Sequence, residues 1–162
     1  SMYKAYETLP DQLKDKIEGL TAIHSGKHIF GEGPDSYYKT SDAGTHEEGT
    51  SRIGNAAVAE MLSDPEHPIV IKHPLSGKKA LYVNPAFTRE VVGLSKTESD
   101  ELLSELYTHV FTGHAFHHRF KWRPGSIAMW DNRSTWHWAL NDYHGQRRVM
   151  HRITIEGCAL NA

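Results

Sequence analysis

The 162-residue sequence contains a single cysteine, Cys158. One thiol cannot build an internal disulfide framework, which excludes the small secreted domains that depend on one and is typical of a reducing compartment. The sequence also lacks an apolar run of the length that a membrane span or a signal peptide needs. We therefore expect a cytoplasmic protein with no membrane partner.

Neither sign of charge is in excess. The 18 lysines and arginines stand against 20 aspartates and glutamates, which gives a formal net charge of −2. A protein that binds nucleic acid usually presents a basic field, so we expect no nucleic-acid partner. The length and the 38% hydrophobic content fit one globular domain with an ordinary core.

Histidine is abundant, with twelve in the chain, and the stretch WDNRSTWHWALNDYHGQRRVMHRIT at residues 130–154 combines histidine with arginine. The neutral imidazole of His137 can ligate a metal. The alternating pattern after residue 145 predicts a strand that places Arg148 and Arg152 on one face, with their stems ~13 Å apart. A guanidinium holds a carboxylate through two parallel hydrogen bonds, so this face has room for two anion sites beside a metal.

The same residues have plainer interpretations. His137 lies between Trp136 and Trp138, which also fits a histidine packed in a core. Arg148 and Arg152 also fit ordinary arginines on the surface of a strand. Residue types and spacing alone leave these alternatives open.

Helices are predicted in two places. Residues 2–8 predict a short helix. Pro10 and Asp11 open a second one, in which apolar residues recur at helical spacing, so we expect helices within residues 2–22. The sequence SKTE at 95–98 has the form of a capping box and predicts a helix over 97–112, closed by Gly113.

A polar segment lies between these helices. Residues 25–63 are rich in Gly, Ser, Asp, Thr and His and have a weak pattern, which predicts a lid or a mobile loop. Within it, His46 and Glu48 have the His-x-Glu spacing of two metal ligands. No strand pattern holds them rigid, as metal ligands need, so we interpret them as part of a solvated loop.

The pattern of the second half is that of β-strands. Residues 69–88 predict a hairpin with its turn at Ser76-Gly77. Further strands are predicted at 115–122, 125–130 and 146–156.

Three polar residues in this half are interpreted as structural. His67 and His73 each precede a proline, which favours extended backbone, and neither has a ligand partner at a useful spacing. Asp131 is interpreted as the cap of a turn.

The ordered string W-D-N-R, T-x-H, D-Y and Q-R-R-x-M-H-R-x-T within residues 130–154 resembles the C-terminal signature of the taurine dioxygenase family. These are iron(II)- and 2-oxoglutarate-dependent oxygenases, and they include the 2,4-dichlorophenoxyacetate and alkylsulfate enzymes. The motifs H-x5-F from His24 and H-P-x-x-G-K-x-x-L-x-V-N-x-x-F-T from His73 extend the resemblance. It implies a β-rich α+β fold, the C-terminal portion of a double-stranded β-helix (jelly roll) with flanking helices, in which residues 1–162 form a single partial domain.

The resemblance also implies roles for five residues. His137 would be catalytic as a ligand of Fe(II), Arg148 would bind the co-substrate 2-oxoglutarate, and Arg152 would bind the anionic head group of the substrate. Phe30 and Phe87 match family positions that border the substrate. The implied function is a dioxygenase of taurine catabolism that uses dioxygen to hydroxylate a small sulfonate.

One departure from the family limits these expectations. The first half of the family members, which supplies a His-x-Asp pair of metal ligands, has no counterpart here, and Ser1-Met2 suggests a cloning remnant or a cut within a longer gene. One ligand of three binds iron feebly. The chain is thus also compatible with an inactive half-domain that pairs its strand edges in a homo-oligomer, or with the same chemistry on a carboxylate, sulfate ester or phenoxyacetate.

Overall fold

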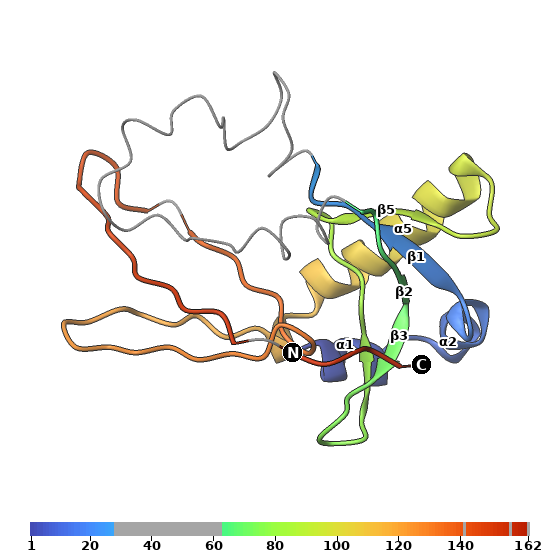
Figure 1. Ribbon diagram of the computed structural model, residues 1–162, viewed down its shortest axis with the longest axis horizontal. Helices are drawn as coiled ribbons and strands as arrows, with labels where there is room; N and C mark the ends of the chain where they lie inside the picture. Colours follow the sequence, from blue (N-terminus) through green and yellow to red (C-terminus); the bar gives the residue numbers. More distant parts are fainter. Residues whose placement is uncertain (28–62, 141, 156, 162) are drawn as a thin grey trace. The chain divides into compact units, whose positions relative to one another are not determined.

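The computed structural model describes residues 1–27, 63–140, 142–155 and 157–161. The chain divides into two compact units (Figure 1). The first comprises residues 1–24, 66–137 and 160–162, and the second comprises residues 25–65 and 138–159. Every helix and strand with described bounds belongs to the first unit.

Two short helices open the chain, as predicted within residues 2–22. Helix α1 spans Met2–Glu7 and helix α2 spans Asp11–Ile17. Pro10 separates them because its ring fixes φ and removes a backbone donor, which suits the position just before a helix. Gly19, with a φ of 74°, ends the helical stretch. The predicted break at Pro10 is confirmed, whereas the second helix ends at Ile17 and not near residue 22.

Strands of three or four residues form two small antiparallel sheets (Figure 1). Strand β1 (Thr21–His24) lies between β2 (Glu66–Pro68) and β5 (Thr88–Val91). Strand β3 (Val70–Lys72) pairs with β4 (Lys79–Leu81). Strands β1 and β2 were not predicted, because a strand of three or four residues is too short to show a measurable alternation of apolar and polar residues.

The predicted hairpin is confirmed as β3 and β4. Its turn is closed by the backbone N–H of Gly77, which donates to the carbonyl of His73 at 2.8 Å. Gly77 has a φ of 68°, a conformation that suits glycine and supports the predicted turn at Ser76-Gly77.

The helix predicted over 97–112 is confirmed as α5, Lys96–Thr112. Ser95 and Glu98 form the expected capping box: the Ser95 hydroxyl accepts from the Glu98 backbone N–H, and Glu98 accepts from the Ser95 backbone N–H at 2.9 Å. Gly113 is the C-terminal cap, and a short 3-10 turn, η2 (His114–Phe116), follows it. Leucine and valine on one face of α5 are buried, at positions 102, 103, 106 and 110.

The core lies between these elements. Helix α1 packs against β4, and α5 packs against β5. The fully buried large side chains are mostly aliphatic: Ile17, Ile69, Ile71, Leu81, Val83, Val91, Leu102 and Leu106. In the described part of the chain, no helix is long and apolar enough to cross a membrane.

The strands predicted at 115–122, 125–130 and 146–156 are not formed in the described residues. The turn between the first two is present, because the Ser126 N–H donates to the Arg123 carbonyl at 2.9 Å. A strand is stable only when a neighbouring strand satisfies its backbone groups, and no described strand pairs with these segments. The alternation in the sequence is therefore insufficient to form strands within this chain.

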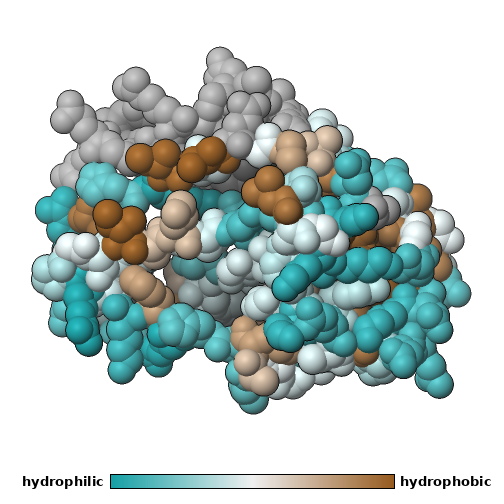
Figure 2. Space-filling view, turned by 90° about the horizontal axis from the view of Figure 1, so that it is seen from below, coloured by the Kyte–Doolittle hydropathy of each residue, from teal (hydrophilic) through white to brown (hydrophobic). Residues whose placement is uncertain are grey.

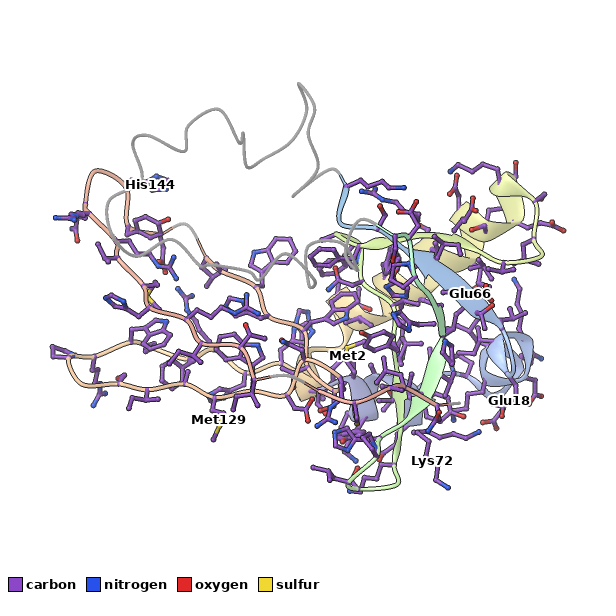
Figure 3. All side chains as sticks on the ribbon, in the orientation of Figure 1. Met2, Glu18, Glu66, Lys72, Met129 and His144 are labelled. Carbon is purple, nitrogen blue, oxygen red and sulfur yellow. The ribbon has the colours of Figure 1, made fainter. Side chains whose placement is uncertain are left out.

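Apolar side chains of these segments are consequently exposed. Figure 2 shows that hydrophobic residues, drawn in brown, do reach the surface on the face it presents. Ile127 is 90% exposed and Met129 is 88% exposed, and Figure 3 shows Met129 pointing away from the ribbon. In the second unit, Ile153 is 92% exposed and Ile155 is 81% exposed. Alternate apolar residues of this kind are typical of strands that a further sheet would cover.

Candidate active site

His137 stacks on a tryptophan that is itself held by a hydrogen bond. The rings of His137 and Trp130 have centroids 4.7 Å apart and are inclined by 21°. The indole N–H of Trp130 donates to the side-chain oxygen of Asn132 at 3.0 Å. The imidazole is exposed, which differs from the packed core histidine of the plainer interpretation.

Trp136, immediately before His137, is held from another direction. Its indole N–H donates to the backbone carbonyl of Val83, the second residue after β4, at 2.8 Å. Its ring packs against Phe111 of α5 at 5.6 Å and against Tyr107 at 6.1 Å between centroids. The chain entering the candidate ligand is therefore attached both to the hairpin and to the long helix.

The turn that precedes His137 is organised by Asp131. Its carboxylate accepts from the backbone N–H and from Nε of Arg133, both at 2.9 Å, and from Nη2 of Arg133 at 2.6 Å. His73 Nε2 lies 2.9 Å from the same carboxylate. Arg133 and, secondarily, His73 hold the pKa of Asp131 well below its usual range. Asp131 thus caps the turn, as the sequence predicted.

The surroundings of His73 define which nitrogen carries its proton. Nδ1 accepts from the backbone N–H groups of Leu75 and Ser76, at 3.3 and 3.2 Å. With Nδ1 used as an acceptor, Nε2 carries the hydrogen and donates to Asp131. His73 is 5% exposed. Its hydrogen bond to Asp131 is therefore a buried polar contact between the β3–β4 hairpin and the turn that leads to His137.

Asp131→Ala is expected to lower the free energy of unfolding by about 2 kcal/mol, because the buried N–H of His73 and the Arg133 guanidinium both lose their acceptor. Urea denaturation measures this loss. The matched control is Asp15→Ala on the exposed face of α2, which should change stability by less than about 0.5 kcal/mol. Equal effects in the two variants would show that Asp131 contributes no specific connection.

A second histidine cluster lies on the sheet formed by β2, β1 and β5. The His24 ring is 5.3 Å from the His67 ring and 5.4 Å from the Tyr82 ring between centroids. His24 Nδ1 lies 3.4 Å from the Thr88 hydroxyl, whereas Nε2 is buried with no hydrogen-bond partner. Burial first, and then the charge of His67, lower the pKa of His24 to about 4. His24 is therefore neutral in the folded protein near pH 7.

This lowered pKa predicts a pH-dependent stability. The unfolded chain, in which the pKa of His24 is about 6.5, binds more protons than the folded chain between pH 4 and 6.5. The free energy of unfolding therefore decreases as the pH falls through this window, by about 2 kcal/mol for this partly buried side chain. Urea midpoints at pH 7 and 4.5 should differ less in His24→Phe than in the parent. The exposed control His144→Phe should keep the parental difference between the two urea midpoints. If His24→Phe also keeps that difference, the assignment of the pH dependence to His24 is wrong.

The two candidate arginines belong to the second unit, and both are exposed. The Arg148 guanidinium carbon lies 5.4 Å from the centre of the Tyr143 ring, a cation–π arrangement that keeps the charge accessible. Arg152 is also solvent-accessible, as an anion-binding side chain must be before its ligand arrives.

The candidate pocket residues are placed unevenly. Phe87 is half-buried and lies in the turn after β4, where its N–H donates to the Asn84 carbonyl at 3.0 Å. Phe30, and also His46 and Glu48, lie outside the described residues.

Residues 1–154 match the family model described as taurine catabolism dioxygenase TauD, TfdA family. The chain belongs to this family. It is 39% identical over 153 residues to an alkylsulfatase of Acinetobacter baylyi, covering 94% of this chain and 45% of that protein. It is 35% identical over 140 residues to an α-ketoglutarate-dependent sulfonate dioxygenase of Saccharomyces cerevisiae, covering 86% of this chain and 30% of that protein.

A solved structure agrees with this membership. The crystal structure of a taurine dioxygenase from Burkholderia xenovorans superposes with a TM-score of 0.58 at 31% sequence identity, covering 82% of this chain and 36% of that one. The chain spans less than half the length of these three family members. The likeness therefore concerns one part of a larger TauD, TfdA protein.

The described residues do not by themselves contain a complete set of iron ligands. A non-haem iron site of this chemistry uses two histidines and one carboxylate. The described residues contain no group of three histidine, cysteine, aspartate or glutamate side chains that could hold a metal. They offer the imidazole of His137 as one ligand, and by themselves they do not fit the whole metal.

Sequence reasoning missed the contacts that hold His137 in place. Neither the Trp136–Val83 hydrogen bond nor the His73–Asp131 pair could be derived, because each joins residues more than fifty positions apart. The only signal was the density of tryptophan and aspartate around His137 in the family motif.

Proposed function

We propose that this chain is the C-terminal part of an iron(II)- and 2-oxoglutarate-dependent dioxygenase that hydroxylates a small anionic substrate. The single observation that carries the proposal is the exposed imidazole of His137, stacked on Trp130 and preceded by the anchored Trp136. It lies in a TauD, TfdA chain whose motif continues to two exposed arginines, Arg148 and Arg152. This arrangement presents one metal ligand and two cationic side chains to solvent.

Each residue is assigned a role that its chemistry suits. The neutral His137 imidazole donates its lone pair to Fe(II). Arg148 holds the far carboxylate of 2-oxoglutarate through two parallel hydrogen bonds, and Arg152 pairs with the anionic head group of the substrate. With Fe(II) held there, dioxygen would be the four-electron oxidant: 2-oxoglutarate would be oxidised to succinate and carbon dioxide with one oxygen atom entering succinate, and the other oxygen atom would enter the hydroxylated substrate. Phe87 and Phe30 are assigned to the apolar wall that excludes water from the substrate.

The exposed alternate residues support the same assignment at the level of the fold. We propose that strands from outside this stretch cover Ile127, Met129, Ile153 and Ile155 and complete a jelly roll. The same part of the fold would supply the remaining histidine and carboxylate. The segments predicted as strands at 115–122, 125–130 and 146–156 would then become regular strands only when they pair with these additional strands.

The proposed substrate is a small sulfonate of the taurine type. A sulfonate offers three oxygens to the Arg152 guanidinium, and the relatives include a sulfate ester dioxygenase of Pseudomonas putida and a sulfonate dioxygenase of Saccharomyces cerevisiae. A sulfate ester, carboxylate or phenoxyacetate carries the same charge, so competition among these anions in a turnover assay distinguishes them.

A second candidate function is supported by the apolar exposure in the described residues. Ile127 and Ile153 are each at least 90% exposed, and such surfaces favour self-association of a non-catalytic half-domain into a homo-oligomer. Sedimentation of the chain at increasing concentration tests this candidate. A chain that stays monomeric would exclude it.

The chain by itself is expected to bind iron weakly and to show little turnover, because His137 is the single family ligand that it carries. Anaerobic titration with Fe(II) or Co(II) in the presence of 2-oxoglutarate, followed by measurement of succinate after oxygen is admitted, checks this. Tight stoichiometric binding with robust succinate release would contradict the ligand assignment and would require other ligands within residues 1–162.

A further inference from the structure

The two tryptophans that flank His137 in sequence have opposite surroundings. Trp136 is half-buried and bonded through its indole N–H to Val83 at 2.8 Å. Trp138 is 68% exposed. If the pair served only to exclude water, similar surroundings would be expected for both. The difference indicates that Trp136, the residue before His137, holds the chain in place.

The hydrogen bond of the Trp136 indole attaches the loop before His137 to the backbone of Val83. Its acceptor is the carbonyl of Val83, which is 2% exposed and belongs to the core. Its ring is held in addition by Phe111 and Tyr107. Because Trp136 and His137 share a peptide bond, restricting the Cα position of Trp136 also restricts the direction in which the His137 side chain leaves the chain.

The other end of this loop is held independently. The Ser134 N–H donates to the Asp131 carbonyl at 3.2 Å, and the Ser134 carbonyl accepts from the N–H of Met2 at 2.8 Å. Between the two fixed ends, the His137 ring lies on Trp130 at 4.7 Å. The loop that carries the imidazole is thus held on both sides of the ring by contacts within the first unit.

We infer that Trp136 is a positioning residue for His137, acting through the hydrogen bond of its indole N–H to Val83. This inference rests on the proposed function, because it concerns the residue assigned as a metal ligand. Orientation before binding matters since a ligand that is free to rotate loses that freedom when the metal binds. Loss of an outer contact that orients a metal ligand typically weakens metal binding about tenfold or more.

The test uses Trp136→Phe, which keeps a ring against Tyr107 and Phe111 but removes the N–H donor, with Trp138→Phe as the matched control. In the metal-free chain, nuclear magnetic resonance of the His137 Cε1–H reports the ring current of Trp130. A titration with Co(II) then reports the metal concentration that half-broadens the same signal. Methyl signals of the core show whether each variant is folded.

Trp136→Phe is expected to move the His137 signal toward the position of the exposed His144 signal and to raise the half-broadening Co(II) concentration about tenfold. Trp138→Phe should change neither. The inference is overturned if Trp136→Phe leaves both readouts at the parental values, or if both variants change them equally. Should Trp136→Phe fail to fold, benzothienylalanine at position 136 preserves the shape without the N–H and must give the same two changes.

The proposed function can fail separately. If Co(II) never broadens the His137 signal in the parent chain, His137 is not a metal ligand and the proposed function is wrong. The metal-free signal still decides whether Trp136 orients the imidazole.

Discussion

In a chimera that joins the first half of the Acinetobacter baylyi alkylsulfatase to this chain, Arg148→Ala is expected to weaken 2-oxoglutarate binding by about 30-fold to several thousandfold. The lost interaction is a charge-assisted pair worth about 2 to 5 kcal/mol when it is buried by the bound ligand. Arg148 is exposed and lies over the Tyr143 ring, so its removal should cost binding and little stability. Anaerobic calorimetry with Mn(II) in place of Fe(II) measures the affinity.

Arg147→Ala is the matched control for this change. In the strand that we propose residues 146–156 form once the fold is completed, alternation would place Arg147 on the opposite face from Arg148. Its removal should therefore leave 2-oxoglutarate affinity within about threefold of the parent. If Arg147→Ala and Arg148→Ala weaken binding equally, the effect is one of overall charge, and the specific assignment of Arg148 is wrong.

The second large effect concerns the substrate. Arg152→Ala is expected to leave 2-oxoglutarate binding intact and to weaken binding of the sulfonate by about 2 kcal/mol or more, roughly 30-fold. In the strand that we propose for the completed fold, residues four positions apart have stems ~13 Å apart, which is too far for one small carboxylate to bridge. Succinate formation that depends on the substrate should therefore fall in Arg152→Ala, while the slow uncoupled decarboxylation of 2-oxoglutarate persists.

Both affinities must be measured in both arginine variants. A loss of both ligands to the same extent in each variant would mean that the two arginines serve one site. An unchanged sulfonate affinity in Arg152→Ala would remove this residue from the substrate site and leave the head group without an assigned partner.

Local signals in the sequence predicted local structure well. The SKTE capping box gave α5 because its hydrogen bonds join residues three positions apart. The Ser76-Gly77 turn gave the β3–β4 hairpin for the same reason, since a turn and its register are set by neighbours. These elements need no information from elsewhere in the chain.

Elements that depend on distant partners were predicted poorly. The alternating segments at 115–122, 125–130 and 146–156 have the composition of strands but no described strand beside them. Strand pattern describes the faces of a strand, not the presence of a neighbour to bond with. Conversely, β1 has a partner strand on each side but only four residues of its own. Four residues are too few for an alternating pattern to predict a strand.

The candidate site shows the same division. The roles of His137, Arg148 and Arg152 stay a prediction that rests on the family motif, because side-chain type alone says only what could ligate a metal or hold an anion. The motif could not predict that Trp136 bonds to Val83 or that His73 bonds to Asp131. Those contacts arise from packing of the hairpin and α5 against the loop, which is a property of the folded chain.

The most direct test of the central claim is succinate formation by the chimera with Fe(II), 2-oxoglutarate and taurine, compared with its His137→Ala and His144→Ala variants. His144 is an exposed histidine seven positions further on, labelled in Figure 3. The parent and His144→Ala should release succinate in proportion to the sulfonate consumed, and His137→Ala should release at least about a thousandfold less, which corresponds to roughly 4 kcal/mol of lost transition-state stabilisation. Equal succinate release by His137→Ala and His144→Ala would contradict the assignment of His137 as the iron ligand that this chain supplies.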